Sequence, residues 1–421
     1  MAQTEQQVVA LELERVLPKV PTLFDREGLF YAALEKRPVE VVSNRDMRIP
    51  LEIRPGGNSG HFDPDGGDLG RGDAPTFDKA TIAPVFLKHG VEVTTLSQWV
   101  TDDRRKAVLN SFRNILAKSM AEFRRYVDSL CMTPGNGVLG TISAVSNAGG
   151  VDTFTLGTDG FGARLLRYGQ TINVYNSTLT TNRTVGAEKK ISFYDLVNKQ
   201  IGVPTVAGPA VPGDLIVSQG LSATPPVSLL GVPYHHNNAS TGSWMGMNRA
   251  TTPEIRASRV SGNNAALTLP LPRLAMNKVG DRIGIDNVGR MQAWMHPCQI
   301  QVYEGLGILM TQINQNPGEG KGLDLYYGGA MQMAGTQVKK SFSWDKTRID
   351  FVSLDVWGRG EMKAAGFYKP EGKSDYIFEV RGVSGGVATS NIFYIVAAFN
   401  IFMNNPAGGV YIDALTVPSG Y

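Results

Sequence analysis

Two neighbouring segments constrain this chain more than any other feature. A polar excursion rich in glycine and aspartate, roughly residues 55–82, lies between two strand-like stretches. An amphipathic helix, residues 101–133, follows almost at once. A protein that works as a monomer rarely carries both a long polar excursion and a long rigid helix. Together they favour a subunit of an assembly over an enzyme.

The excursion follows residues 48–54, where apolar and polar side chains alternate as in a strand. We expect residues 85–93 to be the partner strand and Pro50 to place the first strand at a sheet edge. The excursion holds seven glycines, three prolines and five aspartates. Ordering it costs about 1–2 kcal/mol per residue in backbone entropy. It has few apolar side chains to offset that cost: Phe62, Leu69, Phe77 and Ile82. It is therefore either a mobile flap or a loop ordered by a neighbouring subunit, and the helix favours the second.

The helix has a complete sequence signature. Thr101 supplies a capping hydroxyl and the two aspartates after it supply first-turn acids. Apolar residues then recur at steps of mostly three and four, which makes one continuous stripe from Val108 to Leu130. Pro134 and Gly135 end the helix. At about 1.5 Å per residue the helix is roughly 45–50 Å long, enough to cross a whole domain.

The remaining sequence predicts an α+β fold with six parts. Residues 136–222 contain short strands at 141–145, 153–156, 170–175 and 214–217, separated by Gly, Asn and Pro turns, as in a small inserted antiparallel barrel. Helices are predicted at 270–283 and 300–312. Strands are predicted at 349–351, 354–357, 376–380 and 410–415, and a buried strand or short helix at 392–403. The parts are an N-terminal arm (1–47), the excursion with its strands (48–98), the long helix (99–135), the insertion (136–222), a mixed domain (223–335) and closing β segments (336–421).

Composition excludes several classes of protein. Charged residues make up only 19% of the chain, whereas 48 glycines and 23 prolines suit a β-rich fold with many turns. The net charge of +3 is too small for a strongly basic nucleic-acid binder, so any contact with DNA or RNA is diffuse. The longest apolar run, 392–403, is too short to span a membrane. Cys131 and Cys298 are expected to be buried free thiols.

No motif for catalysis, cofactor binding or metal binding stands out. His235 and His236 are adjacent, so on a strand their side chains point to opposite faces, and no further ligand stands at metal spacing. Residues 366–374 miss the spacing of a phosphate-binding loop, and residues 63–74 miss the pattern of a calcium loop. We therefore expect no enzyme, no cofactor and no resident metal.

The order of these parts resembles that of the major capsid proteins of tailed bacteriophages, of the lambdoid type. In that family a polar arm precedes an extended hairpin, the E-loop, then the long spine helix of the peripheral domain, then an axial domain and closing strands. Later stretches also look like the family: 229–233, 294–297, 399–406 and 409–412. The resemblance covers the chain except 136–222, which it implies is an inserted domain. It implies a fold with a spine helix, an E-loop hairpin and a mixed axial domain.

The resemblance also implies function and partners. The subunits would assemble as homo-hexamers and homo-pentamers into an icosahedral shell around double-stranded DNA, bound without sequence specificity. A portal protein would be a partner, and a decoration protein and a separate scaffolding protein are possible partners. No scaffold is expected within the chain, because fewer than fifty residues precede the E-loop. The protein would reside in the virion and assemble in the host cytoplasm, with no membrane contact.

The resemblance implies that side chains of the E-loop and spine contact neighbouring subunits. The candidates are Arg48, Arg54, Phe62, Leu69, Arg71, Phe77, Lys88, Arg104, Arg105, Arg113, Arg124 and Arg125. Two other interpretations stay open. One is the shell of an encapsulin-like nanocompartment with a protein cargo, although the chain length and the insertion favour the virus. The other is a soluble hydrolase or lectin with a β-rich domain, which the absence of a catalytic motif disfavours.

Overall fold

The computed structural model of the chain describes residues 29–43, 46–61, 65, 70–94, 105–157, 160–184, 188–206, 208–221, 223–284, 290–313, 326–327, 330–369, 377–381 and 387–420. The chain divides into two compact units. The first comprises the described parts of Met1–Ala33, Val85–Cys131 and Glu361–Phe399. The second comprises those of Leu34–Pro84, Met132–Gly360 and Asn400–Tyr421.

The first unit joins a long helix to a β-sheet. The predicted helix is confirmed as α4 (Arg105–Cys131), and Phe123, Val127 and Leu130 of its apolar stripe are buried. α4 contacts α2 (Leu29–Ala33) and β4 (Val85–Thr94). Tyr31 in α2 donates its backbone N–H to the Asp128 carboxylate at 3.0 Å. The sheet order is β20 (Trp357–Phe367), β22 (Val387–Met403) and β21 (Ile377–Arg381), and β4 also pairs with β22.

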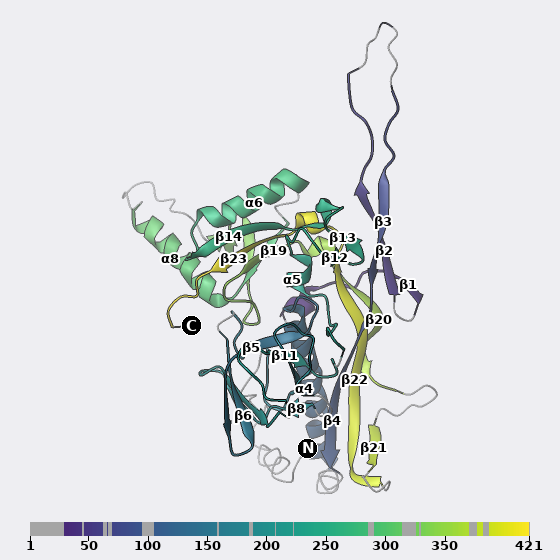
Figure 1. Cartoon of the computed structure of the whole chain (residues 1–421), viewed down its shortest axis with the longest axis vertical. Helices are drawn as coiled ribbons and strands as arrows, with labels where there is room; N and C mark the ends of the chain where they lie inside the picture. Colours follow the sequence, from purple (N-terminus) through teal and green to yellow (C-terminus); the bar gives the residue numbers. More distant parts are fainter. Residues whose placement is uncertain are drawn as a thin grey trace. The chain divides into compact units, whose positions relative to one another are not determined.

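The second unit is built around a mixed seven-stranded sheet (Figure 1). Two pairs are parallel, β14 with β23 and β15 with β18, and the other pairs are antiparallel. The strand order is β14 (Ser258–Ala265), β23 (Val410–Leu415), β19 (Ile349–Val352), β15 (Gln292–Met295), β18 (Thr336–Lys340), β17 (Ala330–Met333) and β16 (Tyr326–Tyr327).

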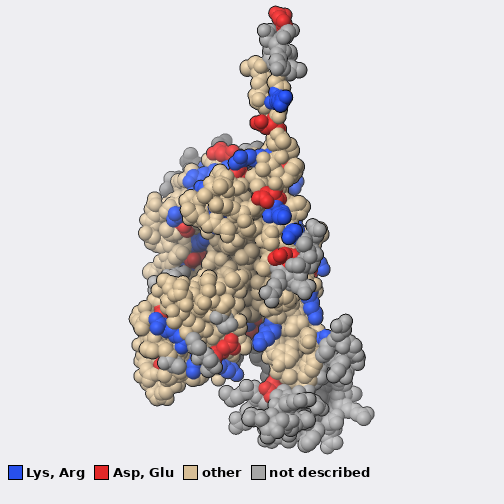
Figure 2. Space-filling view, turned by 45° about the vertical axis from the view of Figure 1, so that its right-hand side comes forward, with Lys and Arg blue, Asp and Glu red and all other residues tan. Residues whose placement is uncertain are grey.

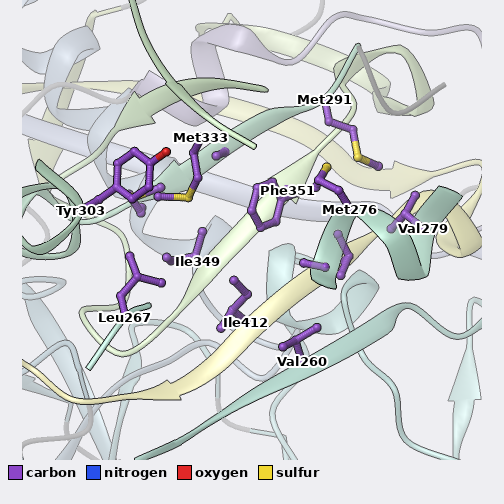
Figure 3. Packing of buried hydrophobic residues seen from close by; sticks show 14 of the residues in the cluster. Val260, Leu267, Met276, Val279, Met291, Tyr303, Met333, Ile349, Phe351 and Ile412 are labelled. Carbon is purple, nitrogen blue, oxygen red and sulfur yellow. The ribbon is translucent and has the colours of Figure 1, made fainter. Parts of the chain in front are cut away.

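Two helices help to bury this sheet. α6 (Pro270–Ile283) has the predicted bounds, and α8 (Pro297–Ile313) contains the predicted helix at 300–312. Met276 and Val279 of α6 pack into one cluster with Phe351 and Ile412 of the sheet (Figure 3). Pro270 is tolerated because the first turn of a helix has no intrahelical partner for its N–H group. Among the described residues, no helix is long and apolar enough to cross a membrane.

Residues 138–218 form a second seven-stranded sheet. The predicted strands correspond to β5 (Val138–Ala148), β6 (Val151–Leu156), β7 (Thr171–Tyr175) and β11 (Leu215–Ser218), although residues 170 and 214 lie just outside β7 and β11. The order is β8-β7-β11-β5-β6-β10-β9, where β8 is Lys189–Lys190, β9 is Phe193–Asp195 and β10 is Gln200–Pro204. β8 and β9 are joined by only two residues. Of these, Ile191 donates its N–H to the Gln170 carbonyl beside β7, and Ser192 donates its N–H to the Gly202 carbonyl in β10. One short segment therefore pairs with both edges of the sheet.

A smaller sheet of β1 (Glu40–Ser43), β2 (Asp46–Arg54) and β3 (Thr76–Ile82) corrects the predicted strand pairing. β2 pairs with β3, from Met47 opposite Ile82 to Arg54 opposite Thr76, whereas β4 pairs with β22. The expected pairing of 48–54 with 85–93 is therefore wrong, and the connecting loop is shorter than the predicted excursion. β2 is also the central strand rather than an edge. Pro50 is tolerated there because β1 pairs with β2 only as far as Arg48.

One further strand prediction fails. Residues 354–356 form a 3-10 turn, Leu354–Val356, rather than the start of a strand. The Val356 N–H bonds to the carbonyl of Ser353, which closes the turn locally. Strand β20 begins at Trp357, directly after it.

Candidate intersubunit contact surface

The β2–β3 hairpin is fixed at its root by an apolar cluster. Met47 and Ile49 of β2 are buried with Ala80 and Ile82 of β3. They pack against side chains from another part of the second unit: Trp244, Met245, Met247, Ile255 and Phe402. The burial of both strands in one cluster holds this end of the hairpin in a single position.

A tight turn between β12 (Ser243–Trp244) and β13 (Met247–Asn248) binds the root of the β2–β3 hairpin. Met245 and Gly246, with φ of 47° and 88°, make the two-residue turn that such short hairpins require. The Met245 carbonyl accepts a hydrogen bond from the Thr81 N–H at 2.8 Å. The Met245 N–H donates to the hydroxyl of Tyr234 at 2.8 Å. The turn thus connects β3 to the body of the unit through backbone groups.

His235, at the end of α5 (Val232–His235), lies beneath this turn and is neutral. Trp244 donates its indole N–H to His235 Nδ1 at 3.1 Å, so Nδ1 is an acceptor and the ring proton lies on Nε2. Nε2 then donates to the Ile401 carbonyl at 3.2 Å. Complete burial lowers the pKa of His235 to about 3, although the Ile401 bond opposes that shift. The imidazole is a structural acceptor and donor, since both nitrogens are used by protein groups.

We expect acid to loosen this root through His235. Its pKa is about 6.5 in the unfolded chain and about 3 in the folded one, so the unfolded state binds more protons between these values. Stability is therefore lost as the pH falls, by about 2–3 kcal/mol from this group at pH 4.5. His235→Gln should remove that part of the loss in urea unfolding at pH 7 and 4.5. His61→Gln, on the exposed hairpin loop, is the control. An unchanged pH dependence in His235→Gln would contradict the assignment.

His236 faces a different set of partners. Its Nδ1 lies 2.9 Å from Asp350 Oδ1, and the same carboxylate accepts hydrogen bonds from Nε and Nη2 of Arg348 and from the Trp344 indole. Burial alone would raise the pKa of Asp350, but Arg348 and the His236 hydrogen bond lower it to about 2. The Arg348 guanidinium also lies 4.1 Å from the ring centre of Tyr411. The two histidines, singled out by the sequence, thus belong to structural networks.

Beyond its root the hairpin is exposed to solvent. The two strands extend away from the rest of the second unit (Figure 1), and every residue from Arg71 to Lys79 is exposed. Phe77 is 67% exposed. Charged side chains of both signs lie along the hairpin (Figure 2). Such an anchored but uncovered hairpin is suited to contact another molecule.

One ion pair connects the outer part of the hairpin to the body. The β2–β3 register shifts between Glu52 and Arg54, and Arg54 Nε lies 2.8 Å from Glu254 Oε1 in the short turn Pro253–Ile255. The hydrogen bond from Arg54 lowers the pKa of Glu254. Both side chains are well exposed, so the contribution to stability is small and sensitive to salt.

We expect this ion pair to restrict the hairpin. Arg54→Glu or Glu254→Arg alone places like charges together and should speed amide exchange in the outer half of β2 and β3 at low salt. The double variant Arg54→Glu/Glu254→Arg restores opposite charges and should return exchange to the original rate. Equal exchange in all four proteins would show that the pair has no such role.

The predicted contact residues fall into three groups. Arg54, Arg71 and Phe77 are exposed on the hairpin, and Arg48 is half-buried near its root. In the first unit, Lys88 on β4 and Arg124 on α4 are exposed, and Arg125 is half-buried and pairs with Glu122 at 2.6 Å. Phe62, Leu69 and Arg104 lie outside the described residues. Arg105 and Arg113 belong to α4, but their side chains also lie outside the described part.

Sequence reasoning missed the residues that hold the hairpin in place. Glu254, Trp244 and Met245 lie far from the hairpin in sequence, and none belongs to a recognisable motif. The dipeptide Met245–Gly246 was a usable signal, because a glycine between two short strand-like stretches favours a tight hairpin turn.

Comparison with known proteins agrees with the fold. No protein-family model matches the sequence, and no curated protein matches it. Among solved structures, the Cyanophage A-1(L) capsid asymmetric unit matches with a TM-score of 0.54 and 13% identity, over 95% of this chain and 96% of that chain. The capsid of the native GTA particle matches with a TM-score of 0.47 and 10% identity, over 94% and 93% of the two chains. The holo-SrpI encapsulin complex from Synechococcus elongatus PCC 7942 matches with a TM-score of 0.40 and 10% identity, over 100% and 99%.

The first of these likenesses establishes the fold. It extends over nearly the whole of both chains, and its TM-score exceeds 0.5. The other two likenesses have TM-scores below 0.5 and are too weak to establish a fold. The chain therefore has the tailed-phage major capsid fold that the order of its segments predicted.

Proposed function

We propose that this chain is the major capsid protein of a tailed bacteriophage and that it has a structural rather than a catalytic role. The observation that carries the proposal is the likeness to a phage capsid subunit along 95% of this chain. The anchored, solvent-exposed β2–β3 hairpin supports it, because such a hairpin has little reason to exist in a monomer. Within the part of the chain that the structure describes, no group of three or more His, Cys, Asp or Glu side chains is placed to hold a metal ion.

In the proposed assembly, homo-hexamers and homo-pentamers close into an icosahedral shell. The hairpin, corresponding to the E-loop, lies across a neighbouring subunit, whose surface offsets the entropy lost when the loop becomes ordered. Each contact is modest, but every subunit gives and receives several of them in a closed shell. The shell is therefore held by many contacts acting together.

The proposed division of the chain follows the same scheme. Residues 1–47 are the arm, 48–98 the E-loop, and 99–135 the spine part of the peripheral domain. Residues 136–222 are an inserted barrel, 223–335 the axial domain, and 336–421 the sheet and closing segments of the peripheral domain. The double pairing of residues 189–195 supports a closed barrel, since these residues connect both edges of the inserted sheet.

The proposed partners are those of a virion shell. Packaged double-stranded DNA would be confined rather than recognised, in keeping with the net charge of +3. A portal protein would occupy one vertex, and separate scaffolding and decoration proteins are compatible with the scheme. Assembly would take place in the host cytoplasm and the mature protein would reside in the virion.

Sedimentation of the chain expressed with its phage's portal and scaffolding proteins tests the proposal. Megadalton particles that protect DNA from nuclease would support the viral shell. Megadalton particles that hold protein cargo and no DNA would support an encapsulin-like compartment instead. A small oligomer under every condition would contradict both.

A further inference from the structure

We propose that Arg164 fixes the inserted sheet rigidly to the main sheet of the second unit, so that the two move as one body. Arg164 lies in the loop that leads from β6 to β7 of the insertion. Its guanidinium reaches across to a loop of the other sheet, residues 341–346, which follows β18.

All three nitrogens of the guanidinium donate to backbone carbonyls. Nη1 donates to the carbonyls of Phe342 at 2.5 Å and Trp344 at 2.9 Å, both in the 341–346 loop of the main sheet. Nε donates to the Phe161 carbonyl at 3.0 Å, and Nη2 donates to that of Gly160. Two contacts fix the side chain on its own loop and two bind the other loop. Only a planar fork with several fixed donors can do this, so lysine cannot replace it.

The loop that carries Arg164 is itself firmly held in the insertion. Ala163, Leu165 and Leu166, which flank it, are all buried. The hydroxyl of Tyr194 in β9 donates to the Ala163 carbonyl at 3.2 Å. Arg164 is therefore held between neighbours in sequence that belong to the core of the insertion.

The 341–346 loop, which accepts hydrogen bonds from Arg164, is in turn held in the main sheet. The Trp344 side chain is buried and stacks on Trp294 of β15, with 5.6 Å between ring centres and 28° between ring planes. Its indole N–H donates to Asp350 at 3.0 Å. Asp350 in turn binds Arg348 and His236. A continuous chain of contacts thus runs from the core of the insertion, through Arg164, to the buried Asp350 carboxylate of the main sheet.

The two loops also meet at a position where only glycine fits. Gly160 has a φ of +86°, and a Cβ built there would lie 1.8 Å from Asp345 Oδ1. The Asp345 carboxylate cannot easily move away, because the same oxygen accepts the N–H and hydroxyl of Thr347 at 2.7 and 2.8 Å. The Lys346 N–H donates to the Gly160 carbonyl at 3.3 Å. The close approach at Gly160 and the fork of Arg164 define one junction.

The test is the distance distribution between two spin labels in the full chain. The labels are placed at Val197→Cys in the insertion and Asn277→Cys on α6, both exposed positions, while the native Cys131 and Cys298 are buried. The parent protein should give one narrow distribution. Arg164→Ala and Arg164→Lys should broaden it, and amide exchange of Lys346 should quicken by about tenfold or more as the junction opens. Lys190→Ala, which removes one exposed positive charge from the insertion, should change neither.

Two outcomes would overturn the proposal. The first is a distribution as narrow in Arg164→Ala as in the parent, with unchanged exchange at Lys346. The second is a broad distribution already in the parent. If Arg164→Ala does not fold, Arg164→Lys provides the same comparison through a milder change, and Gly160→Ala tests the junction from its other contact. Gly160→Ala should shift the mean distance, because its methyl group forces the two loops apart.

Discussion

Replacing residues 55–75 with an Asn-Gly turn is expected to abolish shell assembly while leaving the subunit folded. Arg54 and Thr76 are paired in the β2–β3 register, so a two-residue turn can join them without disturbing the strands. The root residues Met47, Ile49, Ala80 and Ile82 stay in their cluster. Stability of the isolated subunit should therefore change by no more than about 0.5 kcal/mol.

The expected loss of assembly is large because the defect is repeated in every subunit. A contact that is missing once per subunit is missing at every interface of a closed shell, so the yield of particles should fall by about a hundredfold or more. Sedimentation velocity would measure this, with urea unfolding of the subunit in parallel. Phe77→Ser, which removes one exposed ring and keeps the loop, should give an intermediate yield. Particles of the shortened variant at normal yield would contradict the assignment of the hairpin as a contact element.

Asp350→Asn is expected to destabilise the second unit by about 3–5 kcal/mol, the cost of leaving a buried charge without its partner. The carboxylate is 1% exposed and accepts hydrogen bonds from Arg348, His236 and Trp344. An asparagine amide would turn an N–H₂ group towards these donors and leave the Arg348 charge uncompensated. Urea unfolding at pH 7 would measure the loss.

Two further variants show whether the loss of stability in Asp350→Asn comes from the unpaired charge. Arg348→Met/Asp350→Asn removes both charges and should recover part of the loss, because neither buried charge then lacks a partner. Asp355→Asn, at an exposed carboxylate, should have little effect. A double variant less stable than Asp350→Asn alone would show that the ion pair is not the source of the effect.

The sequence predicted elements best where one periodic pattern and clear end signals coincide. α6 has the predicted bounds because Pro270 opens it and apolar residues follow at helical spacing. Of the residues expected to face inward, Ala275, Met276 and Val279 are buried, whereas Leu274 is 46% exposed and its prediction was wrong. β3 was missed because only Ala80 and Ile82 at its inner end are buried. Its outer half faces solvent on both sides, so Phe77, Asp78 and Lys79 show no alternation that a strand pattern could detect.

The exposure of the hairpin was predictable from the sequence but its supports were not, and its role in subunit contact stays a prediction. A polar loop with too few apolar residues to order itself pointed to a partner, and the exposure of Arg71 and Phe77 is in keeping with this. The contacts of Arg54 with Glu254 and of Thr81 with Met245 join positions more than 160 residues apart. Such contacts follow from the tertiary fold, and no local pattern specifies them.

The most direct test of the central claim is electron cryomicroscopy of the particles that this chain forms. The account predicts closed icosahedral shells built of hexamers and pentamers, in which each β2–β3 hairpin lies across a neighbouring subunit and Phe77 is covered by it. A shell in which the hairpins contact no neighbour would contradict the role assigned to them. A chain that stays monomeric or dimeric, even with scaffolding and portal proteins present, would contradict the capsid assignment itself.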